Sequence, residues 1–246
     1  MSGEGRVRDE RGEKIGAFFD LDGTLLPKPS LEWRFIAYLV ARDAITSGHA
    51  LRWLLHAAKT ICRNPRAATS ANKSYLAGLR ESLVSDWATA QHRNPLDFYP
   101  RGVERIRWHL AQQHAVFVVS GTLAPLARTI VKPISPQIEV IATELEVRDS
   151  RWTGRLTGEH MSGAAKRRAI QRAEAKCGLR LDLSYAYGNA MADRAMLQSV
   201  GRPFAVNPTL RLRHLAAKRN WPILDWAEAR KSRAEATNRL AVKEAR

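Results

Sequence analysis

The chain has 246 residues, 45% of them hydrophobic, which suits one large globular domain or a domain with an insertion. Its formal net charge of +16 favours anionic partners such as phosphorylated metabolites, nucleic acid or an anionic membrane surface. Two distant cysteines exclude a disulfide framework, and the seven histidines show no zinc-binding spacing.

Targeting signals and nucleic-acid modules are not visible in the sequence. The N-terminal residues are polar, and no apolar run approaches the length of a spanning helix, so we expect a cytoplasmic protein without a signal peptide. The basic residues are spread along the chain, so we expect no specific nucleic-acid partner. The charge remains compatible with peripheral contact to an anionic membrane.

Residues 15–20 form a short apolar run that leads into two carboxylates, Asp20 and Asp22, followed by Gly23 and Thr24. A run of this length predicts a strand buried on both faces of a sheet. Side chains two residues apart in an extended segment point the same way, so both carboxylates can face one site at the strand end. The alternative is a simple turn in which Asp and Gly only end the strand.

Two neighbouring carboxylates at a strand end suit phosphoryl-transfer chemistry. Asp20 can attack phosphorus and form an aspartyl phosphate, while Asp22 can protonate the leaving oxygen and later activate water. The negative charges of both carboxylates and of a phosphate require a cation, and an oxygen-rich site favours Mg2+. We therefore predict a phosphomonoesterase with magnesium as its cofactor and a small phosphorylated substrate.

Residues 30–94 have a helical pattern and no strand signal, which predicts a cap inserted after the first strand. Ser30 is a candidate cap for a first helix, Gly48 separates it from a second, a third is predicted over residues 70–84, and a shorter fourth holds Trp87. Apolar residues at helical spacing are Trp33, Ile36, Ala37 and Val40, then Leu51, Leu54, Leu55 and Ala58. Basic candidates for substrate contact are Arg34, Arg42, Arg52, Lys59, Lys73 and Arg80.

After a helix over residues 99–113, residues 115–119 predict a second buried strand, which is followed by Ser120, Gly121 and Thr122. The Ser120 hydroxyl and the amides of Gly121 and Thr122 form a candidate phosphate cradle at the start of the next helix. A helix cap made by Ser or Thr predicts the same residues, so this signal is weak by itself. Residues 138–147 predict a further strand, and residues 152–158 the turn and return of a hairpin.

Two later segments add polar side chains. A helix over residues 162–177 carries Lys166 in its first turn, where a cation suggests a nearby anion, because helices favour cations at the other end. A solvated basic helix is the alternative. Residues 183–187 predict a third strand, followed by Asn189 and Asp193. A strand at 204–206, a basic helix to about residue 219 and an edge strand at 223–224 complete the pattern.

Three strands thus end in polar groups, and a parallel sheet would bring these groups to one edge. The predicted fold class is α/β, with a Rossmann-like parallel sheet core flanked by helices and a small all-helical cap inserted after the first strand. We expect the core over residues 14–29 and 96–226, the cap over residues 30–95, and tails over residues 1–13 and 227–246.

The order and spacing of these groups resemble the four motifs of the haloacid dehalogenase-like hydrolase superfamily, along nearly all of residues 14–226. The helical insertion resembles the cap of its phosphoserine phosphatase-like subfamily, IB. The resemblance implies that Asp20 is the phosphorylated nucleophile and a Mg2+ ligand. It implies that Asp22 is the general acid/base and binds the metal through its backbone carbonyl. The remaining implied roles are phosphoryl binding by Ser120 and Lys166, and membership of the metal site for Asn189 and Asp193.

Two departures from the family pattern stand out. The family usually has Gly-Asp where this chain has Gly188 and Asn189, so one negative charge is missing and we predict weaker metal binding rather than inactivity. Phosphoserine phosphatases contact the substrate amine with a glutamate early in the cap. Glu32 is the nearest glutamate here, but its spacing from Asp20 does not clearly match, so phosphoserine is a candidate substrate and not the expected one. The basic cap fits other phosphomonoesters, including lipid-linked ones.

Three alternatives to a phosphatase remain open from the sequence. A member with weakened turnover would act as a phospho-ligand-binding regulator, with Asn189 as its only support. A nucleic-acid-binding protein is suggested by the net charge alone. A phosphotransferase would use the same pair of aspartates. The oligomeric state and the particular phosphomonoester are also open.

Overall fold

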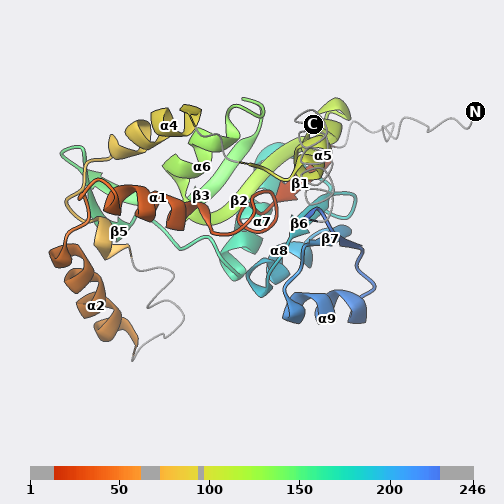
Figure 1. Cartoon of the computed structure of the whole chain (residues 1–246). Helices are drawn as coiled ribbons and strands as arrows, with labels where there is room; N and C mark the ends of the chain where they lie inside the picture. The colour runs from red at the N-terminus through yellow and green to blue at the C-terminus, as the bar shows by residue number, and fades with distance from the viewer. Residues whose placement is uncertain (1–13, 62–72, 94–96, 228–246) are drawn as a thin grey trace, which may run out of the picture.

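The computed structural model describes residues 14–61, 73–93 and 97–227 (Figure 1). The predicted tail over residues 1–13, and the predicted C-terminal tail apart from its first residue, lie outside the described residues. Within the described part of the chain, no helix combines the length and apolar character needed to cross a membrane.

Two sheets and two sets of helices make up the described structure. The strands of the main sheet are β1 (Gly16–Phe19), β2 (Ala115–Leu123), β3 (Glu139–Thr143), β6 (Tyr185–Gly188), β7 (Arg202–Val206) and β8 (Ile223–Leu224). A smaller sheet consists of β4 (Leu145–Arg148) and β5 (Arg151–Leu156). The helices are α1 (Leu31–Val40), α2 (Ser47–Ile61), α4 (Leu83–Arg93), α5 (Pro100–Ala111), α6 (Ala124–Val131), α7 (Ala164–Cys177), α8 (Arg194–Leu197) and α9 (Leu210–Lys218). Short 3-10 turns are η1 (Ser74–Leu76) and η2 (Met191–Asp193).

The main sheet has six strands in the order β3-β2-β1-β6-β7-β8, and all neighbouring strands are parallel. β1 lies between β2 and β6, and all its residues are buried. Successive side chains point into two separate apolar layers, with Phe19 in one and Phe18 in the other. The predicted parallel sheet is therefore confirmed, including the edge strand at Ile223–Leu224.

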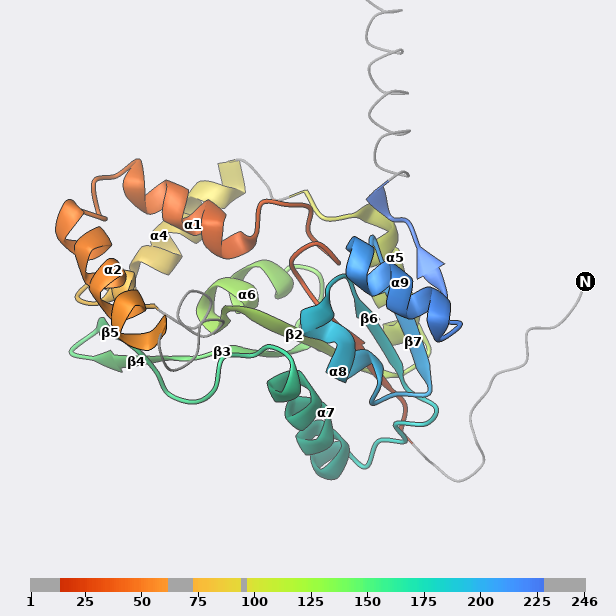
Figure 2. The same ribbon diagram turned by 90° about the horizontal axis from the view of Figure 1, so that it is seen from below.

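Helices cover both faces of the main sheet (Figure 2). α5 and α6 contribute Ile106, Leu126 and Ile130 to the layer that contains Phe19. α7, α8 and α9 supply the apolar side chains of the layer that contains Phe18. Because both faces are covered, ligands reach a sheet of this kind at the carboxyl ends of its strands.

The segment between β1 and α5 forms a separate group of elements to one side of the sheet (Figure 1). It contains α1, α2, η1 and α4, in agreement with an insertion after the first strand. Its core is aromatic, because the Phe35 ring packs edge-on against Trp87 of α4 and against Trp152 of β5, at centroid distances of 6.0 and 6.1 Å. The exact boundary between cap and core stays a prediction.

The helix predicted over residues 70–84 is wrong for the described part of that range. Ser74–Leu76 forms only a short 3-10 turn, Gly78 has a φ of +90°, and α4 begins at Leu83. The Gly78 amide donates to the carbonyl oxygen of Trp152 at 2.8 Å. Pairing with the β4–β5 hairpin thus overrides the local helical pattern, and glycine permits the backbone conformation that this pairing needs.

The boundaries and buried faces of the first two cap helices also differ from the sequence pattern. Gly48 lies within α2, because α1 ends at Val40 and α2 begins at Ser47. The buried face of α1 carries Leu31, Phe35 and Leu39. Among the α1 and α2 side chains whose burial is described, the large apolar ones that remain exposed are Trp33, Val40, Leu51, Leu54 and Leu55.

The strand predicted over residues 138–147 is divided into β3 and β4. β4 and β5 pair antiparallel, and their turn lies at Asp149 and Ser150, which both have positive φ values, rather than within residues 152–158. The hairpin contacts the inserted segment, since the Trp152 amide donates to the carbonyl oxygen of Leu79 at 2.9 Å. The expected all-helical cap layer therefore includes a β-hairpin from the segment that follows β3.

His109 on α5 predicts a loss of stability in mild acid. Its ring is fully buried and contacts Tyr187 Oη at 2.9 Å and His114 Nδ1 at 2.8 Å. Burial, followed by the nearby His114 and Arg105, lowers the pKa of His109 to about 3. The neutral ring therefore stabilises the fold above the unfolded-state pKa near 6.5, and this contribution disappears as the pH falls from about 6.5 toward 3. We expect a loss of about 2 kcal/mol in the free energy of unfolding at pH 5, which denaturant titrations will measure.

The control for this prediction compares two histidine variants. His109→Gln removes this titrating ring and should remove its share, about 2 kcal/mol, of the change in stability between pH 7 and pH 5, while other buried groups such as His160 and Asp20 keep theirs. His214→Gln changes an exposed histidine on α9 and should leave the wild-type dependence in place. Equal slopes for wild type and His109→Gln would show that His109 does not cause the acid sensitivity.

Candidate active site

The carboxyl ends of β1, β2 and β6 meet at one edge of the sheet. Asp20 follows β1 directly, Ser120 lies near the end of β2, and Asn189 follows β6. β1 pairs with both other strands, so the registers bring these three buried side chains to the same edge. One cavity is lined by all of the predicted site residues: Asp20, Asp22, Ser120, Gly121, Thr122, Lys166, Asn189 and Asp193.

Asp20 lies at the centre of the site and is 6% exposed. Lys166 Nζ donates to its Oδ1 at 2.6 Å, and Thr24 Oγ1 donates to its Oδ2 at 2.8 Å. The pKa of Asp20 is raised to about 7, mainly because burial penalises the charged carboxylate and also because Asp193 lies nearby, whereas Lys166 opposes both effects. The two donors hold the carboxylate in one orientation at the cavity wall.

Lys166 occupies the first turn of α7, and its side chain is 2% exposed. Its Nζ donates to Asp20 Oδ1 at 2.6 Å and to Asp193 Oδ1 at 2.7 Å. Burial by itself lowers the pKa of Lys166, but the Asp193 and Asp20 carboxylates outweigh burial and raise it above its usual value. The anion expected beside this lysine is thus a pair of carboxylates, Asp20 and Asp193. The positively charged Lys166 ammonium lies between them.

Asp22 is held by the cap and by β2. The amide of Leu31, the first residue of α1, donates to Oδ1 at 2.7 Å, and Thr122 Oγ1 donates to Oδ2 at 3.1 Å. Burial raises the pKa of Asp22, against the effect of these two hydrogen bonds. A carboxyl group with a raised pKa retains its proton closer to neutral pH, as a general acid requires.

The predicted phosphate cradle does not lie at the start of a helix. Ser120, Gly121 and Thr122 belong to β2, and α6 begins only at Ala124. The Thr122 amide donates to Ser120 Oγ at 3.1 Å, so this amide already has a partner within the same stretch of β2. The Thr122 hydroxyl contacts Asp22, which indicates that Thr122 orients a carboxylate in addition to lining the cavity.

Asn189 and Asp193 form a tight loop after β6. The amides of Asn189 and Ala190 each donate to Asp193 Oδ2 at 3.0 Å, while Asp193 Oδ1 accepts from Lys166. Asn189 packs directly on Gly23, which has a φ of +88°. A Cβ atom at position 23 would lie 2.0 Å from Asn189 Nδ2, so only glycine fits beside this side chain.

The ligand atoms that the site offers are oxygens, the type that magnesium prefers. Among the described residues, no group of three His, Cys, Asp or Glu side chains is placed to hold one metal ion. The cavity is instead lined by the carboxylates of Asp20 and Asp22 and by the amide of Asn189. Mg2+ prefers such hard oxygen donors, and the amide makes this set less negative than an all-carboxylate set.

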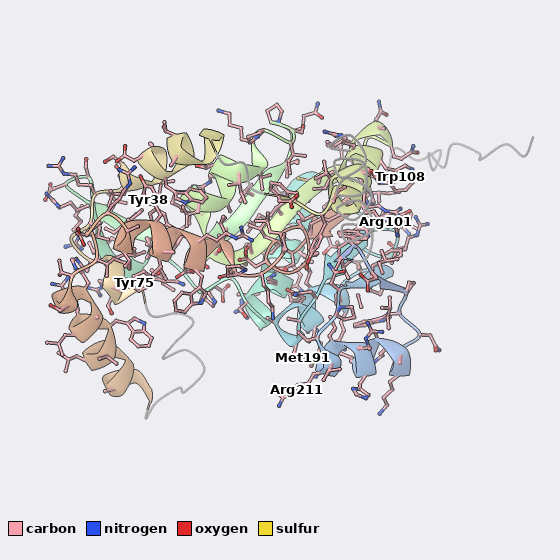
Figure 3. All side chains as sticks on the ribbon, viewed as in Figure 1. Tyr38, Tyr75, Arg101, Trp108, Met191 and Arg211 are labelled. Carbon is pink, nitrogen blue, oxygen red and sulfur yellow. The ribbon has the colours of Figure 1, made fainter. Side chains whose placement is uncertain are left out.

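The cavity is also lined by Glu32, the cap glutamate considered in the sequence, and by Lys73, Tyr75 and His160, which the sequence did not distinguish as site residues. Glu32 accepts hydrogen bonds from Lys73 Nζ, at 2.5 and 2.6 Å to its two oxygens, and from the Tyr75 hydroxyl. Tyr75 lies on the cap side near α1 and α2 (Figure 3). His160 is neutral near pH 7, because burial, followed by Lys73, lowers its pKa to about 4. Lys73 is one of several basic cap residues in the sequence, and only the fold distinguishes it.

The cavity continues from the two aspartates into the cap and has a volume of about 670 Å³. Volumes in this range hold small-molecule ligands. Fold and site together define an α/β enzyme with a two-aspartate centre at the carboxyl edge of a parallel sheet and a cap above it.

Comparison with known proteins gives the family. Residues 17–198 match the family model of the haloacid dehalogenase-like hydrolases, and the chain belongs to this family. The resemblance seen in the sequence is thereby confirmed, and the chain is an enzyme of the hydrolase class.

Individual relatives agree with this assignment. SerB1, a phosphoserine phosphatase of Mycobacterium tuberculosis, is 30% identical over 224 residues, which are 88% of this chain and 72% of the relative. The crystal structure of a Bordetella pertussis protein of unknown function is 28% identical, with a TM-score of 0.70, and covers 87% of this chain and 99% of that one. A phosphoserine phosphatase structure with a phospho-aspartyl intermediate analogue is 19% identical, has a TM-score of 0.59 over 87% of this chain and 94% of that chain, and shows the shared fold.

Proposed function

We propose that this protein is a Mg2+-dependent phosphomonoesterase that works through an aspartyl phosphate on Asp20. The observation that carries the proposal is the pair of aspartates with distinct partners: Asp20 beside a charged lysine, and Asp22 held by Leu31 and Thr122. The name of SerB1 and the family match support a phosphatase.

The proposed reaction has two steps. An Asp20 carboxylate oxygen attacks phosphorus, the bond from phosphorus to the leaving oxygen breaks, and the leaving alcohol takes a proton from Asp22. Water then attacks the phosphorus of the aspartyl phosphate and gives a proton to Asp22, which releases inorganic phosphate and restores Asp20. The sum is one phosphomonoester and one water converted into one alcohol and one phosphate.

The charged residues of the site support phosphoryl transfer by neutralising charge. Lys166 offsets the negative charge that collects around Asp20, and we propose that Ser120 and the Gly121 amide contact phosphoryl oxygens from the other side. Lys166 also keeps Asp193 in place, and Asp193 in turn holds the amides of the loop after β6.

Magnesium would be held by Asp20, the backbone carbonyl of Asp22 and Asn189, with Asp193 as the remaining candidate ligand. When bound, the ion supplies positive charge that binds the phosphoryl group and offsets the two aspartates. Both Asp193 oxygens already accept hydrogen bonds from Lys166 and from loop amides, which supports a positioning role for this residue. The cytoplasmic location, the lack of a specific nucleic-acid partner and the contact with anionic membranes stay predictions.

The test of the proposed function is phosphate release from a generic aryl phosphate, measured with Mg2+ and with EDTA. We expect turnover that depends on Mg2+ and an acid-stable phosphoenzyme that hydroxylamine cleaves, as an acyl phosphate requires. No turnover of several phosphomonoesters at any Mg2+ concentration would contradict the proposal. That result would favour the alternative of a phospho-ligand-binding regulator.

Replacing Asn189 by aspartate should strengthen magnesium binding. The change restores one negative charge beside the proposed ligands, so we expect a roughly tenfold lower half-saturating Mg2+ concentration for turnover. Without metal, the added charge lies near Asp20 and Asp193 and should lower the melting temperature, and Mg2+ should then raise it more than in wild type. If wild type and Asn189→Asp gave the same Mg2+ dependence, both in thermal unfolding and in turnover, the result would contradict a metal site at Asn189.

A further inference from the structure

The part of the cavity beyond the two aspartates has an apolar wall. Five side chains of the cap helices and their connection line it: Trp33, Ile36, Ile45, Ala50 and Trp53. Asp22, the proposed proton donor to the leaving oxygen, accepts from the amide of Leu31 at the start of α1, so the leaving group of a phosphomonoester at Asp20 is expected on the side of this wall. Apolar surfaces of this kind favour a leaving group that loses its own apolar area to them.

The two charged cap residues that line the cavity beside this wall, Glu32 and Lys73, neutralise each other. Glu32 lines the cavity, but both of its oxygens accept from Lys73 Nζ, at 2.5 and 2.6 Å, and the Tyr75 hydroxyl donates to it as well. The Lys73 and Glu32 side chains are only 4% and 16% exposed. The ammonium of Lys73 thus forms an ion pair with the Glu32 carboxylate, which would otherwise attract a positively charged substrate.

The other carboxylates at the cavity do not replace Glu32 in that role. Asp20 and Asp193 share Lys166, and Asp22 lies at the proposed leaving oxygen, where Leu31 and Thr122 hold it. In the described cap residues that line the cavity, Glu32 is the one carboxylate. An ammonium group on the leaving alcohol would therefore face either apolar side chains or a carboxylate that already has a partner.

We propose that the substrate is a phosphomonoester of an uncharged, largely apolar alcohol, and that Lys73 determines this specificity through its ion pair with Glu32. The proposal rests on the proposed phosphatase function and names its substrate class. Ammonium-bearing esters such as phosphoserine and phosphoethanolamine are excluded, because their amine would have to displace Lys73 from a buried ion pair. Alkyl and aryl alcohols share the required chemistry.

A series of n-alkyl phosphates from ethyl to octyl tests the apolar wall. Each added methylene that the wall covers should raise kcat/KM about threefold to fourfold, until the cavity is full. Phenyl and naphthyl phosphate in the same assay separate aryl from alkyl leaving groups. Equal kcat/KM for ethyl and octyl phosphate, measured below the micelle concentration, would overturn the proposal, as would a preference for O-phosphoserine.

Propyl phosphate and phosphoethanolamine are a matched pair of substrates that tests the role of Lys73 in specificity. They have the same length, but propyl phosphate ends in a methyl group and phosphoethanolamine in an ammonium group. Wild type should prefer propyl phosphate by about tenfold or more. Lys73→Met should raise the ratio of phosphoethanolamine to propyl phosphate turnover by about tenfold, because Glu32 becomes available to the substrate ammonium. Lys73→Arg, which keeps the charge, should retain the wild-type preference.

Lys176→Met is the control, because Lys176 forms an exposed ion pair with Glu139 on the core and should leave the ratio unchanged. An unchanged ratio in a folded Lys73→Met variant would show that Lys73 does not determine specificity.

Binding of non-hydrolysable phosphonates separates this proposal from the proposed function. Calorimetry with propyl-, octyl- and 2-aminoethylphosphonate needs no turnover and uses the wild-type chain with Mg2+. One outcome is a protein that hydrolyses nothing but binds octylphosphonate more tightly than propylphosphonate, and propylphosphonate more tightly than 2-aminoethylphosphonate. That outcome would support the proposed specificity and reject the proposed phosphatase function. Turnover of phosphomonoesters together with preferential binding of 2-aminoethylphosphonate would support the phosphatase function and reject the proposed specificity.

Discussion

Replacing Asp20 by asparagine is expected to lower kcat for phosphate release by about 10⁴-fold or more, because the amide oxygen is a poor nucleophile toward phosphorus. The side chain keeps its shape, and Thr24 can still donate to the remaining oxygen. The folded structure should survive, because Lys166 retains its ion pair with Asp193. Continuous assay of phosphate release, together with hydroxylamine-sensitive phosphoenzyme, measures the effect.

Stability gives the Asp20 variant a second, independent readout. Because the folded-state pKa of Asp20 is raised to about 7, its carboxyl group stabilises the fold fully below the unfolded-state value of 3.8. That contribution is lost as the pH rises from 3.8 through 7. Asp20→Asn should therefore unfold at the same or a higher denaturant concentration than metal-free wild type at pH 8.

The control for Asp20→Asn is the same substitution at a distant surface position. Asp182 pairs with Arg180 at the protein surface, and Asp182→Asn should leave both turnover and its metal dependence unchanged. If Asp20→Asn retained more than about a hundredth of wild-type kcat, Asp20 would not be the nucleophile.

Replacing Lys166 by methionine is expected to reduce both catalysis and stability. The variant leaves Asp20 and Asp193 buried without their shared counter-charge, which should cost about 3 kcal/mol in the free energy of unfolding of the metal-free protein at pH 8. Without the positive charge beside the attacking carboxylate, kcat/KM should fall by about 10³-fold. Denaturant titration and phosphate release measure the two effects.

Two further variants separate charge from packing at this position. Lys166→Arg keeps the charge and should retain more of the stability than of the activity, since the larger guanidinium does not reproduce the two Nζ contacts at 2.6 and 2.7 Å. Adding Asp20→Asn to Lys166→Met removes one of the two stranded carboxylates and should recover part of the lost stability. Turnover within tenfold of wild type in Lys166→Met would argue against its role in phosphoryl transfer.

The lysine and the aspartates also explain why the site depends on the whole fold. Asp20 leaves the central strand, Lys166 arrives from the helix before β6, and Asp193 follows β6. None of these three residues identifies its partners within its own segment. Their combination buries one ammonium between two carboxylates, and such a group is stable only where all three arrive together.

The parts of the site that follow local rules were predictable from the amino acids. A buried run that leads into Asp20 and Asp22 implies a central strand and a pair of carboxylates at its end, because strand burial and side-chain alternation are local properties. Strand ends with Ser120 and Asn189 then follow from the geometry of any parallel sheet. The six-stranded sheet and the shared cavity agree with this reasoning.

The cap depended on contacts that local patterns do not contain. Residues 74–82 have the apolar spacing of a helix, but Gly78 bonds to Trp152 of the hairpin and the helix does not form. The Lys73–Glu32 pair joins residues 41 positions apart and depends on how η1 docks against α2 and β5. Any of the basic cap residues has the charge to pair with Glu32.

By itself, the sequence determined the family, the parallel sheet and the aspartate pair, because periodicity, strand length and motif order are written in short stretches of chain. The tertiary structure alone decided which lysine neutralises Glu32, which carboxylates share Lys166, and that apolar side chains of the cap line the same cavity as the aspartates. The physical reason is that burial and ion pairing depend on the partners brought together from distant segments, and these partners exist only after the chain has folded.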